Sequence, residues 1–152
     1  MDPLKRPCGT VLEAARRQGY KTGMVVTAKI TDATPASFAS HVVDRNYENT
    51  IAELLIGNGL LNRSVDLLFG VTPFFWSGVV IVGGRCHFLP KENPESCRLD
   101  DKDLLAQALD AGFTYIPDRN TFDTLNRGSA APLPLLGLFS RGVNPPLFPS
   151  NK

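Results

Sequence analysis

Short apolar runs alternate in this chain with segments that carry helix start and stop signals, and this alternation constrains the fold more than any other feature. The apolar runs predict buried strands at residues 23–28, 65–69, 113–116 and 133–139. Strands that alternate with helices are usually joined by crossovers and run parallel. The sequence therefore predicts an α/β fold, with a mostly parallel sheet and helices on both faces.

For two of these strands the sequence also indicates their position in the sheet. Residues 23–28 are apolar without strict alternation, which is typical of a strand covered on both faces. Pro134 suits only the first position of a strand or an edge strand, because proline cannot donate a ladder hydrogen bond.

Two of the expected helices begin with the Thr-x-x-Glu spacing of a capping box, at Thr10 and at Thr50. A glycine ends each of them, because glycine adopts the left-handed conformation that closes many helices. The first helix should stop at Gly19, and the other at Gly57 or Gly59.

Two more helices are expected. Thr34 suits an N-cap and Pro35 suits a first turn, so a helix should run from Pro35 to about Asn46. Residues 101–111 have an amphipathic pattern that Gly112 closes.

Size and charge narrow the possible functions. The chain has 152 residues, 43% of them hydrophobic, which suffices for one domain with a core. Sixteen basic residues against 15 acidic ones give a formal charge of +1, so nucleic acid is not an expected partner. The most apolar stretch, residues 71–82, is shorter than the roughly 20 residues that span a bilayer, so no membrane segment is expected in this chain.

Three cysteines and two histidines limit the sites that the chain can build. No CxxC spacing is present, so a thiolate zinc cluster is not indicated. Cys86 and Cys97 could close a disulfide loop in an oxidising compartment, but spacing alone slightly favours two free thiols. His41 is expected to be a packed or hydrogen-bonded helix residue and His87 a loop or strand residue, so neither predicts a metal ligand.

Asp32 and Thr34 lie where a buried strand ends and a helix begins, which is the edge at which parallel sheets bind their ligands. Carboxylate and hydroxyl oxygens suit Mg²⁺. The local pattern is also that of a turn and a helix cap, and on local grounds the cap is the stronger interpretation.

Arg45 is a candidate phosphate ligand, because a guanidinium can bind an oxyanion through two hydrogen bonds. A straight helix would place its far end roughly 15 Å from Asp32, so the two side chains meet only if that helix is short. On local grounds a surface arginine paired with Asp44 or Glu48 is the stronger interpretation.

Taken together, these segments resemble the alkaline phosphatase family. The resemblance is carried by PCGTVLEAA, by YKTGMVVTAKITDATPASFASHVVDRN, by VDLLFG continued by GGRCHFLP, and by PLPLLGLF. It covers residues 2–139 and is most specific over residues 23–45. In its details the chain is most similar to the fungal vacuolar branch, which implies a vacuolar or secretory location.

The resemblance implies roles for three residues. Asp32 and Thr34 correspond to ligands of the family's Mg²⁺, and Arg45 to the arginine that binds the substrate phosphate. Family members hydrolyse phosphate monoesters through a phosphoserine, with two Zn²⁺ ions that activate the serine and water. Full-length members are usually homodimers.

The chain departs from the family pattern in what it lacks. The family's nucleophilic serine lies upstream of the point where this chain begins, and most zinc ligands lie downstream of its last expected strand. Residues 1–140 are therefore expected to form a partial catalytic domain that is inactive alone. The alternative is a non-catalytic fragment that binds Mg²⁺, an anion or another protein, and a related phosphotransferase or sulfatase is a third possibility.

Residues 71–82 interrupt the resemblance. In the family, the strand that matches VDLLFG leads directly into a glycine triplet, and joining Gly70 to Gly83 and Gly84 restores it. The segment is therefore expected to be an insertion, and one hypothesis is that it is translated intron, as is the irregular proline-rich tail at 141–152. The alternative for the insertion is a genuine apolar hairpin or interface loop.

Overall fold

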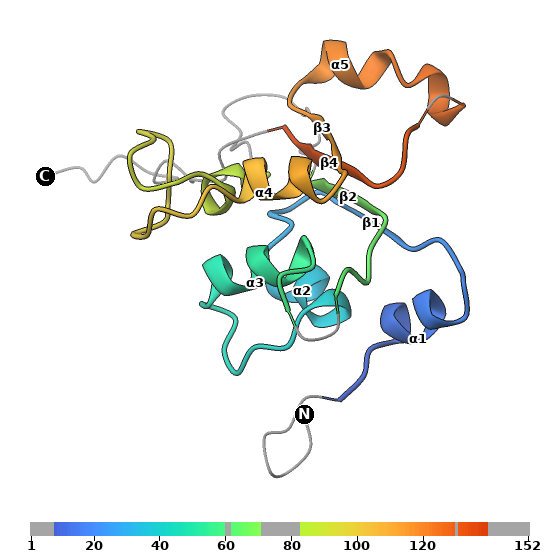
Figure 1. Ribbon diagram of the computed structural model, residues 1–152, viewed down its shortest axis with the longest axis horizontal. Coiled ribbons are helices and arrows are strands. Elements are labelled where there is room, and N and C mark those ends of the chain that lie inside the picture. The colour runs from blue at the N-terminus through green and yellow to red at the C-terminus, as the bar shows by residue number, and fades with distance from the viewer. Residues whose placement is uncertain (1–7, 60–61, 71–82, 130, 140–152) are drawn as a thin grey trace, which may run out of the picture.

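The computed structural model describes residues 8–59, 62–70, 83–129 and 131–139, and Figure 1 shows their arrangement. Four strands form one sheet in the order β1-β2-β4-β3, and every neighbouring pair is parallel. The predicted parallel sheet is thus confirmed. The strands are β1 (Gly23–Val26), β2 (Leu67–Gly70), β3 (Thr114–Ile116) and β4 (Leu135–Leu138).

Helices cover both faces of the sheet, as the sequence predicts. On one face α2, α3 and α4 enclose the main core, and α5 lies across the other face (Figure 1). The helices are α1 (Val11–Arg17), α2 (Ala33–Ala39), α3 (Glu48–Leu55), α4 (Leu104–Asp110) and α5 (Arg119–Asp123), with 3₁₀ turns η1 (Arg85–Phe88) and η2 (Asn126–Gly128).

The main core follows from side-chain alternation along the parallel strands. Met24, Leu68 and Leu136 share one register row and point to the same face. Apolar residues of the covering helices close over them, and most of these side chains are almost completely buried. They include Ala36, Ala39, Ile51, Ala52, Leu55, Leu104 and Ala108.

The opposite face has a smaller aromatic core. Phe69 lies 5.7 Å from Phe122 of α5 and 5.8 Å from Phe139, measured between ring centroids. Phe69 also lies over Gly137 on β4, where an added Cβ would be 2.1 Å from the ring. Glycine at this position therefore lets the aromatic cluster form against the sheet.

One prediction about β1 is wrong. Val25 is 65% exposed, and the strand alternates between buried and exposed residues instead of being covered on both faces. The reason is that β1 is an edge strand, and among the described residues the aromatic cluster of the second face is built on the other strands.

The predicted second helix is also shorter than expected. It spans Ala33–Ala39 with Asp32 at the N-cap, so Thr34 lies inside its first turn and does not cap it. Ser40 ends the helix in an extended conformation, and its hydroxyl donates to the Ala36 carbonyl. The next residue, His41, lies against Glu13 of α1. This tertiary contact takes the chain out of the direction of α2 and ends the helix early.

Of the other helix signals, some are confirmed and one is wrong. The capping box at Thr10 and Glu13 forms as predicted, and Gly112 adopts a positive φ after α4. The capping box predicted at Thr50 and Glu53 does not form, because α3 begins at Glu48 and Glu53 instead binds basic side chains.

Pro134 comes just before β4, which is an interior strand and not an edge. It precedes the paired residues and its carbonyl accepts a hydrogen bond from the Thr114 N–H, so the ladder loses no donor. No helix in the described part of the chain is long and apolar enough to cross a membrane.

Residues 71–82 and 141–152, on which the insertion and tail predictions fall, lie outside the described residues. The flanks of the insertion do meet: a Cβ added to Gly70 would lie 2.5 Å from the Gly83 carbonyl oxygen. This contact is compatible with joining Gly70 to Gly83, and the intron hypothesis remains a prediction.

Candidate metal and phosphate site

A cleft at the carboxyl end of β1 gathers the three site residues that the sequence singles out. It has a volume of about 510 Å³, and Asp32, Thr34 and Arg45 all line it. Residues 25–28, at and just after the end of β1, form another part of its wall. The structure therefore brings together side chains up to 13 positions apart in the sequence, at the sheet edge where parallel folds bind ligands.

Asp32 occupies the N-cap position of α2, but its carboxylate makes no capping hydrogen bond to the helix. Its Oδ2 instead accepts from the Lys29 backbone N–H at 3.2 Å, which closes the turn before the helix. Its Oδ1 faces the Lys29 ammonium at 3.8 Å, beyond direct hydrogen-bonding distance. The side chain is 30% exposed, so a cation can reach it.

Thr34 is an exposed residue in the first turn of α2. Its backbone carbonyl accepts from Ser37, whereas its hydroxyl has no hydrogen-bond partner within the described part of the chain. The hydroxyl that the local pattern assigned to helix capping is therefore available to a ligand in the cleft.

Arg45 reaches the cleft because α2 is short. The helix ends at Ala39, and the loop that follows brings Arg45 to the cleft. Arg45 therefore does not lie at the far end of a long helix, where the sequence placed it. The expected pairing of Arg45 with Asp44 or Glu48 is absent: Asp44 accepts from the Asn46 N–H, and Glu48 binds other partners. Among residues 8–59, 62–70, 83–129 and 131–139, no carboxylate forms an ion pair with Arg45.

Glu48 binds the lysine that faces Asp32. Its Oε1 binds the Lys29 ammonium, and its Oε2 accepts from the Thr31 hydroxyl at 2.7 Å and faces His87 Nε2 at 3.0 Å. Burial alone would raise the pKa of Glu48, but hydrogen bonds from His87, Lys29 and Thr31 outweigh it and lower the pKa to about 2. Glu48 is therefore ionised at neutral pH.

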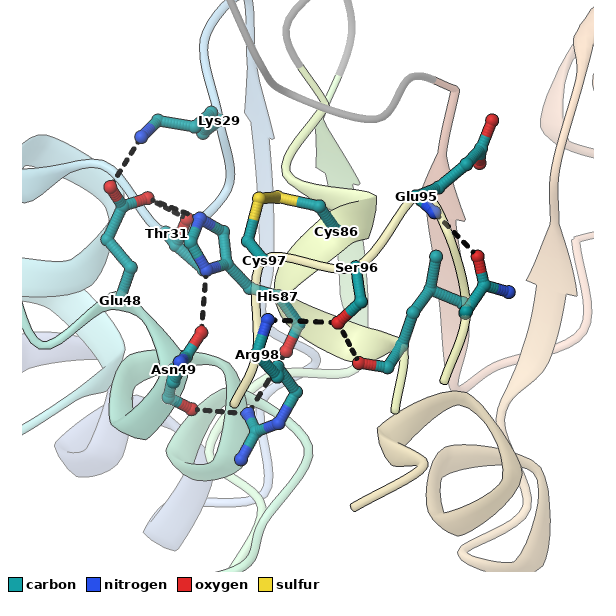
Figure 2. The surroundings of a disulfide bond; sticks show 12 residues. Lys29, Thr31, Glu48, Asn49, Cys86, His87, Glu95, Ser96, Cys97 and Arg98 are labelled. Atoms are coloured by element: carbon teal, nitrogen blue, oxygen red, sulfur yellow. Dashed lines mark hydrogen bonds and ion pairs between the residues drawn. A yellow bond between two sulfur atoms is a disulfide. The ribbon is translucent and has the colours of Figure 1, made fainter. Parts of the chain in front are cut away.

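A disulfide lies next to this network, as Figure 2 shows. Cys86 and Cys97 are bonded, so the preference for two free thiols is wrong. The fold places their Cα atoms 4.9 Å apart, within the range that a disulfide bridges, and sequence spacing alone cannot supply that distance. Cys8 is free and exposed.

Arg98, which follows the disulfide directly, is the most completely paired cation of this region. Its side chain is 0% exposed and binds Glu53 and Asp100, together with the backbone carbonyls of Asn49 and His87. Burial would lower the pKa of Arg98, but the hydrogen bonds from its guanidinium to the two carboxylates raise it. These contacts fasten the disulfide loop to α3 and η1.

The two histidines take part in hydrogen bonds, as expected for His41. His41 lies after α2 and not within it, and its Nε2 is 2.6 Å from Glu13 Oε1 in the wall of a separate cavity of about 690 Å³. His87 lies in η1, with Nδ1 2.8 Å from Asn49 Oδ1.

Zinc and magnesium make different demands on these residues. Within the described ranges, the potential ligand atoms of Cys86, His87 and Cys97 lie within 4.8 Å of one another. The disulfide occupies both sulfurs, and both ring nitrogens of His87 face oxygen acceptors, so these residues do not fit a zinc site. Asp32 and Thr34 supply the hard oxygen atoms that Mg²⁺ prefers, and they fit that ion.

Sequence reasoning missed Lys29 and Glu48 as neighbours of the site. Lys29 and Asp32 are three positions apart and oppositely charged, and this spacing was the local signal that could have indicated their contact. The partners of Glu48 are 17 to 39 positions away, so no local pattern could have indicated them.

Several known proteins are similar to this chain in sequence. Residues 1–145 match the model of a family described as alkaline phosphatase. An alkaline phosphatase of Schizosaccharomyces pombe is 51% identical over 137 residues, which are 90% of this chain and 23% of that protein. The repressible alkaline phosphatase of Saccharomyces cerevisiae is 47% identical over 148 residues, which are 92% of this chain and 24% of that protein.

A solved structure has the same fold. It is a variant of TAB5 alkaline phosphatase with Mg bound in its M3 site, with a TM-score of 0.64 and 26% identity. The match covers 93% of this chain and 33% of that one. The chain thus spans about a quarter of its yeast relatives and a third of this structure, and corresponds to part of their fold.

Proposed function

Because this chain belongs to the alkaline phosphatase family, we propose that its cleft binds Mg²⁺ and the phosphate group of a phosphate monoester. Asp32 and Thr34 are the proposed Mg²⁺ ligands, and Arg45 is the proposed phosphate ligand. The single observation that supports this proposal most is that all three side chains line one cleft.

The magnesium part of the proposal rests on oxygen atoms that are open to a ligand. The Asp32 carboxylate does not cap α2, and the Thr34 hydroxyl has no partner among the described residues. Two protein oxygens are enough for Mg²⁺, which keeps several of its waters. When bound, Mg²⁺ would supply positive charge and ordered water beside the phosphate.

The phosphate part rests on a guanidinium without a carboxylate partner in the described chain. Arg45 is exposed and lines the same cleft as Thr34 and Asp32. Its planar fork can donate two parallel hydrogen bonds to phosphate oxygens, which would orient a monoester above the end of β1.

The reaction that we propose for the longer protein is hydrolysis of phosphate monoesters. In that reaction this cleft binds the substrate phosphate and orients it. The described residues contain no group that fits Zn²⁺, and no nucleophilic serine is assigned to the cleft. We therefore expect the isolated chain to be inactive.

An activity assay tests that expectation. Purified with Zn²⁺ and Mg²⁺, the chain should not release p-nitrophenol from p-nitrophenyl phosphate above a blank. Turnover that disappears in Arg45→Ala would show that the chain is catalytic and would contradict the expected inactivity.

A second candidate is a non-catalytic module that binds Mg²⁺ or an anion, and the same open side chains favour it. Calorimetric titration separates binding from an inert fragment. Phosphate should bind in the presence of Mg²⁺, and Arg45→Ala should weaken that binding about tenfold through loss of charge-assisted hydrogen bonds. Equal affinity in the variant would remove Arg45 from the proposal.

A further inference from the structure

The Asp32 carboxylate has a cationic neighbour in its own loop. Lys29 Nζ lies 3.8 Å from Asp32 Oδ1, whereas the same ammonium lies 2.5 Å from Glu48 Oε1. Lys29 therefore binds Glu48 directly and approaches Asp32 without a hydrogen bond. An ammonium in direct contact with Asp32 would compete with a divalent cation for the same oxygen.

Glu48 is fixed independently of Lys29. Its second oxygen accepts from the Thr31 hydroxyl at 2.7 Å and faces His87 Nε2 at 3.0 Å (Figure 2). Glu48 is also the first residue of α3, so its backbone belongs to a helix packed in the core. These contacts keep the carboxylate in place and prevent it from following Lys29 toward the cleft.

We propose that Glu48 is a positioning residue that holds Lys29 away from Asp32 and so keeps the Asp32 carboxylate open to Mg²⁺. The inference rests on the proposed function, because it needs Asp32 to be a magnesium ligand. Glu48 acts through Lys29. The closer the ammonium lies to Asp32, the more strongly it repels an incoming Mg²⁺ and competes with it for the carboxylate.

The direct test is Glu48→Gln, with Mg²⁺ binding measured by calorimetric titration of the full chain with magnesium chloride. The neutral amide releases Lys29, which can then move into contact with Asp32. Shortening the separation from 3.8 Å to about 2.8 Å should lower the Mg²⁺ affinity about three- to tenfold.

Two companion variants distinguish this role from a purely structural one. Glu48→Gln combined with Lys29→Met should regain the wild-type affinity, because the competing cation is gone. A structural role for Glu48 would leave the double variant as weak as the single one. Lys29→Met alone keeps Glu48 with Thr31 and His87 and should bind Mg²⁺ more tightly than wild type, so it tests the idea even if Glu48→Gln does not fold.

Asp44→Asn is the charge-matched control. It removes a negative charge from the loop beside Arg45 without releasing Lys29, and its affinity should stay within twofold of wild type. An equal loss in Asp44→Asn and Glu48→Gln would overturn the inference in favour of a general charge effect.

Measurements on the wild-type chain and on Asp32→Ala distinguish a failure of the Glu48 inference from a failure of the proposed Mg²⁺ site. Binding that is lost in Asp32→Ala but unchanged in Glu48→Gln and in Lys29→Met overturns the inference and leaves the proposed site standing. No Mg²⁺ binding by the wild-type chain overturns the proposed site and the inference together.

Discussion

Two arginines of this chain have opposite environments. Arg98 has a side chain with 0% exposure, and its guanidinium binds two carboxylates and two backbone carbonyls. Arg45 is exposed in a cleft, and the described residues offer it no carboxylate partner. The comparison separates a cation whose contacts hold the fold together from one that lines a cleft and has no ion-pair partner among the described residues.

The same difference extends to the neighbourhoods of the two residues. Around Arg98, the guanidinium pairs with the carboxylates of Glu53 and Asp100 beside the disulfide, and little polar capacity is left for a ligand. Around Arg45, the Thr34 hydroxyl and one oxygen of Asp32 lack a direct hydrogen bond among the described residues. Polar atoms that line a cleft without a direct hydrogen bond therefore mark the candidate site better than the densest polar cluster does.

The largest effect on stability is expected from Arg98→Met. The change leaves Glu53, Asp100 and two carbonyls without their buried cation, and it should lower the free energy of unfolding by about 3 kcal/mol, because both carboxylates are partly exposed. Urea denaturation followed by circular dichroism measures it. Arg119→Met, which breaks an exposed i,i+4 pair, is the control and should cost less than about 0.5 kcal/mol.

Loss of the disulfide should come next. Replacing both Cys86 and Cys97 with serine opens a loop whose ends are 11 positions apart, which should cost about 2.5 kcal/mol through the entropy of the unfolded chain. Cys8→Ser should leave the urea midpoint unchanged. A double variant as stable as wild type would show that the Arg98 contacts hold this loop without the disulfide.

A smaller effect is expected from acid. The folded pKa of Glu48 is lowered from 4.5 to about 2, so its contribution to stability is complete above pH 4.5 and is lost as the pH falls toward 2. Because the side chain is partly exposed, solvent screening limits that contribution to about 1 kcal/mol. Glu48→Gln should flatten this part of the pH profile, and an unchanged profile would contradict the assignment.

The smallest effect on stability should follow Arg45→Ala. The side chain is exposed and makes no ion pair within the described ranges, so the free energy of unfolding should change by less than about 0.5 kcal/mol. Urea denaturation beside Arg98→Met tests the contrast directly. A comparable loss of stability in the two variants would show that the two arginines do not differ in role.

Local signals predicted the parts of the fold that depend on neighbouring residues. Apolar runs located the four strands, and Thr10, Gly57 and Gly112 marked helix ends that the structure contains. The length of α2 could not be predicted, because His41 is drawn toward Glu13 across 28 positions. The disulfide likewise depends on a distance that the folded chain sets.

The residues of the candidate site were likewise predicted only in part. The D-A-T-P-A segment and its resemblance pointed to Asp32, Thr34 and Arg45, and the structure places them in one cleft. Their local pattern also predicted that Thr34 caps the helix, which is wrong because Asp32 takes the N-cap position. Lys29 and Glu48 were missed because their contact spans 19 positions and leaves no periodic pattern in the sequence.

Paramagnetic broadening by Mn²⁺, which replaces Mg²⁺ at oxygen sites, tests the central claim most directly. In amide NMR spectra of the chain, the first signals to broaden should be those of residues 27–34 and Arg45, with Thr124 and Leu125 unaffected at the same Mn²⁺ concentration. Asp32→Ala should abolish this pattern. Uniform broadening, or broadening centred on another part of the molecule, would contradict a metal site formed by Asp32 and Thr34.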